Sequence, residues 1–324
     1  MTEKIVIIGG GQTSISCASQ LRSIGFDCEI SIICEENSYP YQRPPLSKKF
    51  LTGHILEDRL LLKKKDYYKS NNIQVFLSNR AIKIDRENKK IHLQNEQIID
   101  YTKLVIATGS RAKKLPLDEK ESYSNIFYLR NLNDAKNLKN ILIRGKKILI
   151  IGGGYLGLEV ASACSSFGMT TIVIEGGDRI LKRVAGEPTA EYLKKIFSSN
   201  GVEVIENEFV KKINSNNKIV SSVELVSGKL IDLDNLLVAT GGYPVVNLAK
   251  EAKLQIENGI KVNERLETND PSIYAAGDCA SFINNGEVLR LESVGNAIDQ
   301  GQTVALNIAG KITTFNAKPW FWTE

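Results

Sequence analysis

Histidine is scarce in this sequence, and the cysteines lack any metal-binding or redox spacing. Only two histidines occur, His54 and His92, although most general acid–base mechanisms depend on this residue. Five cysteines are present, but no two of them have the C-x-x-C or C-x-x-x-x-C spacing of a zinc site or a redox disulfide. We therefore predict chemistry that needs no histidine base, no bound metal and no dithiol, with both histidines in exposed positions.

Long apolar runs and a large excess of one charge are also missing. No run of about 18 apolar residues occurs, so no membrane span is expected. The net charge of +5 over 324 residues is far from the basic stripe of a nucleic-acid-binding protein. The first apolar segment begins almost at Met1 and leaves no room for a signal peptide, which predicts a cytoplasmic location. The length suggests two domains of ordinary size.

A glycine-rich turn follows that first apolar segment. In KIVIIGGGQTSIS, the residues Gly9, Gly11 and Ser14 occupy the three glycine positions of the G-x-G-x-x-G pattern. Small residues there allow a tight turn, close approach to a pyrophosphate and close packing of helix on strand. Glu35 ends the next apolar strand, where a carboxylate can accept the ribose 2′-hydroxyl. The segment predicts a dinucleotide-binding strand–helix–strand unit in which Ser14 is small enough to replace the third glycine.

The whole unit is repeated near the middle of the chain. KKILIIGGGYLGLEVASACSSFGMTTIVIEGG contains Gly152, Gly154 and Gly157 at the same spacing and ends its second strand with Glu175. Two such units predict two dinucleotides, or one dinucleotide and a flavin. A carboxylate at Glu175 accepts a 2′-hydroxyl and repels a 2′-phosphate, so NADH is favoured over NADPH. Two arginines close behind it keep NADPH open as an alternative.

Two further apolar strands each run into the sequence Ala-Thr-Gly. Thr108 and Gly109 follow the first of these strands, and Gly241 follows the second. A glycine at the end of such a strand lets the backbone turn where a cofactor comes near. Asp278 follows another short strand, where it can bind a chain of sugar-like hydroxyls, or alternatively act as a helix N-cap.

One stretch is specific enough to indicate a family. Residues Pro40 to Lys48 read PYQRPPLSK, and the segments RLESVGNAIDQG and PWFWTE follow near the end. With the two glycine units, this sequence resembles the NAD(P)H:ferredoxin (rubredoxin, putidaredoxin) reductase family, flavoproteins with two dinucleotide-binding domains. The resemblance covers essentially the entire chain. It implies FAD and NADH as cofactors, with NADPH less favoured, and a small iron–sulfur protein as electron acceptor.

The same resemblance implies a role for individual residues. The first glycine unit with Glu35 would hold the ADP half of FAD, and the second with Glu175 and Gly241 would hold the nicotinamide dinucleotide. Rigid prolines would keep two cations in place, Arg43 near the phosphates of FAD and Lys48 near its isoalloxazine ring. The other residues implied around FAD, with Thr108 and Gly109, are Ala81, Arg111, Arg130, Asp278 and Val294.

Glu159 follows the last glycine of the second unit. In the family that the chain resembles, an equivalent glutamate pairs with the lysine of the PPLSK motif beside the flavin. We therefore expect a Lys48–Glu159 ion pair near the site of hydride transfer, and we predict these two as the catalytic residues. The alternative is an exposed glutamate in the first turn of a helix, favoured there by the helix dipole.

The fold expected from these units is α/β, with two Rossmann-like three-layer domains of glutathione-reductase-like type. Residues 1–112 with 242–324 would form a discontinuous FAD domain, and residues 113–241 an inserted NAD domain. Two strand–turn–strand patterns, RENKKIHLQNEQIID and NSNNKIVSSVELVSGKLIDLD, would add a small antiparallel crossover sheet to each.

The expected activity is hydride transfer from NADH to FAD followed by release of single electrons to a ferredoxin or rubredoxin. Two alternatives stay open: an NADH oxidase or diaphorase, and an NADH-sensing flavoprotein of apoptosis-inducing-factor type with slow turnover. No nucleic-acid or membrane partner is expected. The sequence ends at Glu324, where the family continues into a C-terminal domain, so we expect that domain to be absent. The aromatic residues Trp320, Phe321 and Trp322 would then form an apolar patch that a homodimer could cover.

Overall fold

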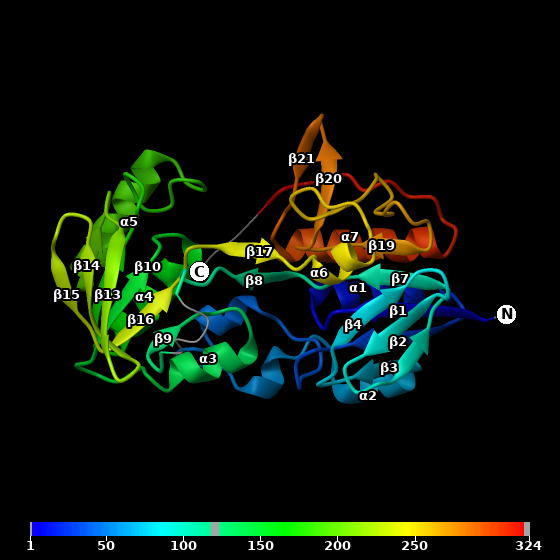
Figure 1. Cartoon of the computed structure of the whole chain (residues 1–324), viewed down its shortest axis with the longest axis horizontal. Coiled ribbons are helices and arrows are strands. Elements are labelled where there is room, and N and C mark those ends of the chain that lie inside the picture. Colours follow the sequence, from blue (N-terminus) through cyan, green and yellow to red (C-terminus); the bar gives the residue numbers. More distant parts are fainter. Residues whose placement is uncertain (1, 118–122, 321–324) are drawn as a thin grey trace. The chain divides into compact units, whose positions relative to one another are not determined.

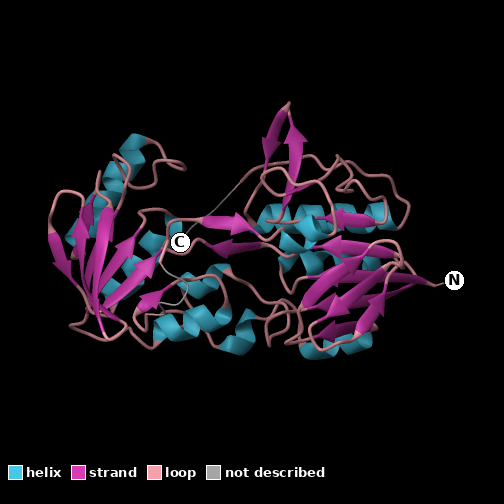
Figure 2. Cartoon of the chain, viewed as in Figure 1, coloured by secondary structure: helices cyan, strands magenta, loops and turns pink. Residues whose placement is uncertain are grey.

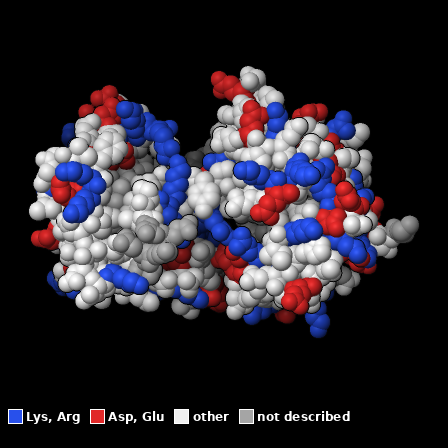
Figure 3. Space-filling model, in the orientation of Figure 1, with Lys and Arg blue, Asp and Glu red and all other residues white. Residues whose placement is uncertain are grey.

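The computed structural model describes residues 2–117 and 123–320, which form two compact units. Among these residues, unit 1 contains 2–42, 60–111 and 244–320, and unit 2 contains 43–59, 112–117 and 123–243. Of the aromatic residues at the end of the sequence, Phe321 and Trp322 lie outside the described part, and Trp320 lies within it. No helix of the described part is long and apolar enough to cross a membrane. On the face drawn in Figure 3, charged side chains of both signs are interspersed.

Unit 1 is built on a five-stranded parallel sheet with the order β19-β7-β1-β2-β3 (Figure 1). Its strands β1, β2 and β7 are rich in Ile, Val and Leu, as expected of strands that are largely buried on both faces. Helix α1 connects β1 to β2 and packs against α7, the last helix of the chain. The bounds are β1 Glu3–Ile8, β2 Cys28–Ile33, β3 Ile73–Phe76, β7 Lys103–Ile106, β19 Ile273–Ala275, α1 Gln12–Ser23 and α7 Val294–Ile308.

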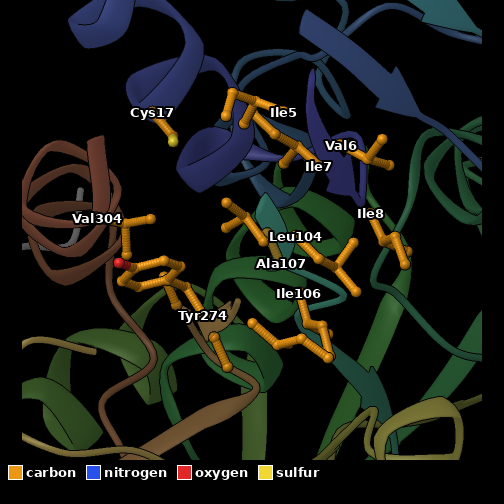
Figure 4. Packing of buried hydrophobic residues seen from close by; sticks show 14 of the residues in the cluster. Ile5, Val6, Ile7, Ile8, Cys17, Leu104, Ile106, Ala107, Tyr274 and Val304 are labelled. Carbon is orange, nitrogen blue, oxygen red and sulfur yellow. The ribbon is translucent and has the colours of Figure 1, made fainter. Parts of the chain in front are cut away.

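The core of unit 1 lies where this sheet meets helices α1 and α7. Figure 4 shows apolar side chains of β1 and β7 packed with Tyr274 of β19, Cys17 of α1 and Val304 of α7. Each of these three residues is at most 2% exposed. Burial of this apolar surface is the main force that stabilises the unit and fixes the sheet edge where β1 ends. The labelled side chains from β1 and β7 are Ile5, Val6, Ile7, Ile8, Leu104 and Ile106.

Two smaller sheets and two short helices complete unit 1. The predicted strand–turn–strand near residues 86–100 is confirmed as part of an antiparallel sheet β4-β5-β6. A second small sheet has the order β18-β20-β21. The bounds are β4 Ala81–Asp85, β5 Lys90–Leu93, β6 Ile98–Asp100, β18 Ile260–Lys261, β20 Ala280–Asn284, β21 Glu287–Leu289, α2 Lys65–Ser70 and α6 Asn247–Glu251.

Unit 2 repeats the parallel architecture with the strand order β12-β11-β10-β16-β9. Helix α4 connects β10 to β11, and α5 connects β11 to β12. The second predicted strand–turn–strand is confirmed as the antiparallel meander β13-β14-β15, drawn in magenta in Figure 2. The bounds are β9 Ile126–Phe127, β10 Lys147–Ile151, β11 Thr170–Ile174, β12 Val202–Ile205, β13 Val210–Asn216, β14 Ile219–Leu225, β15 Leu230–Asp232, β16 Asn235–Val238, α4 Tyr155–Ser166 and α5 Glu187–Ser199.

Several short elements precede the parallel sheet of unit 2 or leave it. The PPLS segment forms a 3₁₀ helix, as two consecutive prolines at its first positions favour. Helix α3 begins with a capping box in which Asn131 and Asp134 satisfy each other's backbone N–H groups. Strands β8 and β17 pair in a two-stranded sheet. The bounds are η1 Pro44–Ser47, η2 Glu57–Leu60, α3 Leu132–Lys139, β8 Ser110–Ala112 and β17 Gly242–Pro244.

This architecture confirms the predicted α/β class with two parallel sheets and a small antiparallel sheet in each half. The assignment of FAD to residues 1–112 with 242–324, and of NAD to residues 113–241, stays a prediction.

Candidate functional site

The first glycine turn lies between β1 and α1 in unit 1. Gly9 has φ +125°, and a Cβ there would come closer than 3.0 Å to the carbonyl oxygen of Ala107, so only glycine fits. Gly11 is the N-cap of α1, and a Cβ on it would meet nothing within 4 Å. Ser14 is fully buried, and its hydroxyl donates to the Gly9 carbonyl at 2.5 Å. Its side chain therefore occupies the position of a third glycine without separating helix from strand.

The second glycine turn, between β10 and α4 in unit 2, has the same geometry. Gly152 has φ +112°, and a Cβ there would lie 2.5 Å from the Ala239 carbonyl oxygen. Gly154, the N-cap of α4, has no atom within 4 Å of its Cβ position. At Gly157 a Cβ would come closer than 3.0 Å to the carbonyl oxygen of Gly152, so helix α4 tolerates no side chain there.

Both turns have the features that a dinucleotide phosphate requires. The backbone N–H groups of the first turn of a helix have no intrahelical acceptors, and neither α1 nor α4 has a side-chain cap that accepts from them. Open space at Gly11 and Gly154 lies at the same helix ends. A phosphate there would accept from those N–H groups and interact with the positive end of the helix dipole. The residues of both turns therefore fit the nucleotides that the sequence predicts.

The two predicted ribose-binding glutamates have different partners. Glu35 follows β2 and is bound by Arg111, whose Nη2 lies 2.7 Å from Oε2 and 2.8 Å from Oε1. This pair is solvent-exposed, with 43% of the arginine side chain and 55% of the glutamate accessible. Glu175 directly follows β11, and its two oxygens accept from the backbone N–H groups of Gly153 and Gly177, each at 2.7 Å. A backbone cradle thus fixes Glu175, whereas a flexible side chain contacts Glu35.

The Ala-Thr-Gly strands contact the glycine turns of their own units. The carbonyl groups of residues 107 and 239, which Gly9 and Gly152 approach, belong to these strands. Gly109 and Gly241 have φ of +70° and +102°. Thr108 donates its hydroxyl to the Val245 carbonyl at 2.7 Å. Each Ala-Thr-Gly therefore lies at the carboxyl edge of a parallel sheet, where nucleotides bind in open α/β folds.

Asp278 lies at the same edge of the sheet in unit 1. Its Oδ2 accepts from the Ser110 hydroxyl at 3.0 Å, and its carbonyl accepts from Arg290 Nη1 at 3.0 Å. Gly277 before it donates its N–H to the buried Gln300 side chain at 2.7 Å. Strand β20 follows Asp278, so the alternative of a helix N-cap is wrong.

Ser110, Arg290 and Gln300 are contacts of the Asp278 turn that the sequence alone does not predict. Arg290 and Gln300 belong to the RLESVGNAIDQG segment, which is the only sequence signal for them. Val294 is the first residue of α7, and Ala81 is the buried first residue of β4.

In unit 2 residues 43–48, which are Arg43 and the PPLSK segment, contact α4 and the loop before α3. Lys48 Nζ lies 2.8 Å from Glu159 Oε1, with side-chain exposures of 15% and 8%. Arg43 Nη1 donates to the carbonyl of Arg130 at 2.9 Å. The structure thus brings together Lys48 and Glu159, so the alternative of an exposed helical glutamate is wrong. Their role in hydride transfer stays a prediction.

The cysteines and histidines offer little further chemistry. All five cysteines are buried, and none of them forms a disulfide in the described part of the chain. Burial raises the pKa of the Cys164 thiol to about 12, so this thiol stays protonated near neutral pH. His54 is exposed as expected, but His92 is half-buried within β5, because that strand is part of the small antiparallel sheet.

Comparison with known proteins gives long, continuous matches. The family model of pyridine nucleotide-disulphide oxidoreductases matches residues 3–301. A rubredoxin-NAD(+) reductase of Pseudomonas putida is 37% identical over 322 residues, which cover 99% of this chain and 83% of the relative. Putidaredoxin reductase of the same species is 32% identical over 328 residues, covering 99% and 78%.

Solved structures agree with these sequence matches. Putidaredoxin reductase in its covalent complex with putidaredoxin superposes with a TM-score of 0.95 at 32% identity, covering 99% of this chain and 79% of that one. A ferredoxin reductase from Rhodopseudomonas palustris gives the same TM-score and identity, with coverage of 99% and 80%. The resemblance to ferredoxin and rubredoxin reductases is thereby confirmed, and the chain belongs to the pyridine nucleotide-disulphide oxidoreductase family.

Proposed function

We propose that this protein is a flavoprotein reductase that takes a hydride from NADH onto FAD and passes single electrons to a small iron–sulfur protein such as a rubredoxin or ferredoxin. The observation that carries the proposal is the pair of glycine turns. In each turn a Cβ would clash with a backbone carbonyl at the first glycine of the pattern, Gly9 or Gly152, and would meet only open space at the second, Gly11 or Gly154. The named activities of the relatives support the same chemistry. Bound FAD supplies the ability to accept two electrons together and release them one at a time.

The residues of unit 1 would hold FAD. The N–H groups at the start of α1 and the backbone at Gly11 would bind its pyrophosphate. Glu35 would accept from the adenosine ribose, and Arg111 beside it would help to neutralise the phosphates. Asp278, held by Ser110 and Arg290, would accept from the hydroxyl groups of the ribityl chain.

The residues of unit 2 would bind NADH. The start of α4 and the backbone at Gly154 would bind its pyrophosphate, as in unit 1. Glu175 presents a carboxylate whose position is fixed by two backbone N–H groups. Such a carboxylate can still accept a 2′-hydroxyl, but it repels a 2′-phosphate, so NADH would be the preferred donor. The Lys48–Glu159 pair would supply a positioned ammonium group for the flavin.

Anaerobic stopped-flow reduction of the FAD-reconstituted protein tests this function. We expect NADH to bleach the flavin absorbance, NADPH to do so at least about tenfold more slowly, and added rubredoxin or ferredoxin to restore it. Reduction by NADH without reoxidation by either iron–sulfur protein would contradict the electron-transfer part. Failure to bind FAD would contradict the whole proposal.

A further inference from the structure

The Lys48–Glu159 pair has a third member, Ser47. The Ser47 hydroxyl donates to Glu159 Oε2 at 2.5 Å, while Lys48 Nζ lies 2.8 Å from Oε1 of the same carboxylate. Two consecutive residues of the chain therefore bind the two different oxygens of one glutamate. A hydrogen bond to a charged acceptor is short and strong, and it also fixes the plane of the carboxylate.

Burial makes this contact important. Ser47 is 4% exposed, and the Glu159 side chain is 8% exposed. A carboxylate in such surroundings has little access to water, so the loss of a donor is not compensated by solvent. The negative charge of Glu159 is therefore stabilised by a hydroxyl as well as by an ammonium group.

The local backbone keeps Ser47 and Lys48 in this arrangement. The two prolines that begin η1 fix their own φ angles. The Pro44 carbonyl lies 3.4 Å from Ser47 Oγ and 3.3 Å from Lys48 Nζ, and the Lys48 N–H donates to the Pro45 carbonyl at 3.0 Å. Glu159 comes from α4, whose N-terminus forms the second glycine turn. The contact thus links the rigid proline turn to the helix that would bind NADH.

We infer that Ser47 is a positioning residue: its hydroxyl holds the Glu159 carboxylate so that Lys48 keeps a fixed place and an incompletely neutralised charge. The inference rests on the proposed function, because the fixed ammonium group matters through the flavin. A nearby positive charge favours the negatively charged form of a neighbouring group. Without the Ser47 hydroxyl, the carboxylate plane would no longer be fixed, the ammonium group would lose its fixed place, and reduction of bound FAD would become less favourable.

The first arm of the test uses the FAD-free protein. Lysine acylation at Lys48, followed by peptide mass spectrometry, should become about fivefold faster in Ser47→Ala, because the acceptor of Lys48 is then mobile. Ser47→Thr keeps the hydroxyl and should retain the slow rate. Ser166→Ala, which removes a hydroxyl elsewhere on α4, is the matched control and should leave Lys48 unchanged. Equal rates in all variants, or an equal rise in Ser47→Thr and Ser47→Ala, would overturn the inference.

The second arm measures the midpoint potential of the FAD-loaded protein. Ser47→Ala should shift the equilibrium between oxidised and reduced flavin about tenfold toward the oxidised form, which is about 30 mV for a two-electron couple. In a Glu159→Gln background, the same change should have no effect, because the hydroxyl acts through that carboxylate. Equal shifts in both backgrounds would contradict the inference. If no variant bound FAD, the proposed function would fail, and the Lys48 labelling would still decide whether Ser47 fixes the pair.

Discussion

The two glycine turns differ in the side chain that fits at the third position of the glycine pattern. In unit 1 the third position is Ser14, whose hydroxyl bonds to the first glycine of its turn. In unit 2 the same position is Gly157, where even a Cβ would come closer than 3.0 Å to the carbonyl of Gly152. The first turn of α4 therefore lies too close to the carbonyl of Gly152 for a side chain, whereas the first turn of α1 leaves room for a serine. A departure from the glycine pattern is thus informative only when the distance between helix and strand is known.

The glutamates that follow the two turns differ in how firmly their partners hold them. Glu35 is paired with the Arg111 side chain at an exposed position, and Glu175 is bound by two backbone N–H groups. An exposed ion pair contributes little to stability and can reorganise when a ligand arrives. Backbone donors do not move independently of the fold, so the second glutamate is the more rigid of the two.

Exchanging the third residues should produce the largest effect on stability. Gly157→Ser should destabilise unit 2 by about 3 kcal/mol, because its side chain overlaps the Gly152 carbonyl and forces helix from strand. Ser14→Gly should cost unit 1 only about 1 kcal/mol, the value of one hydrogen bond and some chain entropy. Thermal unfolding followed by circular dichroism measures both. Similar losses for both variants would show that the two helices are equally close to their strands.

The second glycines should separate binding from folding. Gly11→Ala and Gly154→Ala introduce a methyl group into open space, so both variants should fold normally. That methyl would meet the phosphates, and each variant should weaken its own nucleotide by about tenfold or more, which is about 1.4 kcal/mol. Fluorescence titration with FAD and with NADH measures the two affinities. Loss of both nucleotides in a single variant would contradict the assignment of one nucleotide to each turn.

Replacing the two glutamates should reveal their difference in rigidity. Glu175→Gln leaves one of the two glycine N–H groups facing an amide that cannot accept, which should cost about 1–2 kcal/mol of stability. Glu35→Gln breaks only exposed ion pairs, with Arg111 and with Arg80, and should cost less than about 1 kcal/mol. Urea unfolding of the ligand-free protein compares them. A larger loss for Glu35→Gln would reverse the proposed order.

The smallest expected effect is on the stability of unit 1 at acid pH. Burial disfavours the charged form of Asp270 in unit 1, but hydrogen bonds from Ser272 and Arg86 outweigh it and keep its pKa below the usual value. The stabilisation from this carboxylate is therefore fully present above the unfolded pKa of 3.8, and it is lost as the pH falls through the lower folded pKa. In Asp270→Asn, the free energy of unfolding of unit 1 should therefore fall less on acidification than in the unaltered chain, by about 1 kcal/mol or less.

Unit 2 offers a matched control for that variant. The backbone N–H of Lys147 and the ammonium of Lys146 lower the pKa of Asp234, which is more exposed than Asp270. Asp234→Asn should therefore change the acid dependence less than Asp270→Asn does, as measured by thermal unfolding between pH 6 and pH 3. An unchanged acid dependence in Asp270→Asn would contradict the stabilising role of its ion pair.

The sequence was most informative where the signal is local. The spacing of Gly9 and Gly11 predicts the first turn, because strand, turn and helix are consecutive and the glycine φ is a local requirement. The two Ile- and Val-rich parallel sheets follow from the same local patterns. Lys48 and Glu159 could be paired only through the resemblance to a family, since 111 positions separate them in the sequence.

Contacts between residues that are far apart in the sequence could not be predicted from the sequence. Ser110 meets Asp278 across 168 positions, and Ser47 meets Glu159 across 112. No periodicity or spacing specifies such pairs, because they depend on how sheet edges and helix ends come together in the folded chain. Serine is also a frequent residue of turns, so its type alone gives no functional signal.

The most direct test of the assignment of one nucleotide to each glycine turn is an anaerobic NADH titration of three proteins reconstituted with FAD: the unaltered chain, Gly11→Ala and Gly154→Ala. We expect one equivalent of FAD in the unaltered chain and full bleaching by NADH. We expect weakened FAD retention in Gly11→Ala, and normal FAD with weakened NADH binding in Gly154→Ala. An unaltered chain that stays colourless, or a Gly154→Ala variant that loses FAD and keeps its affinity for NADH, would contradict the proposed binding of FAD and NADH.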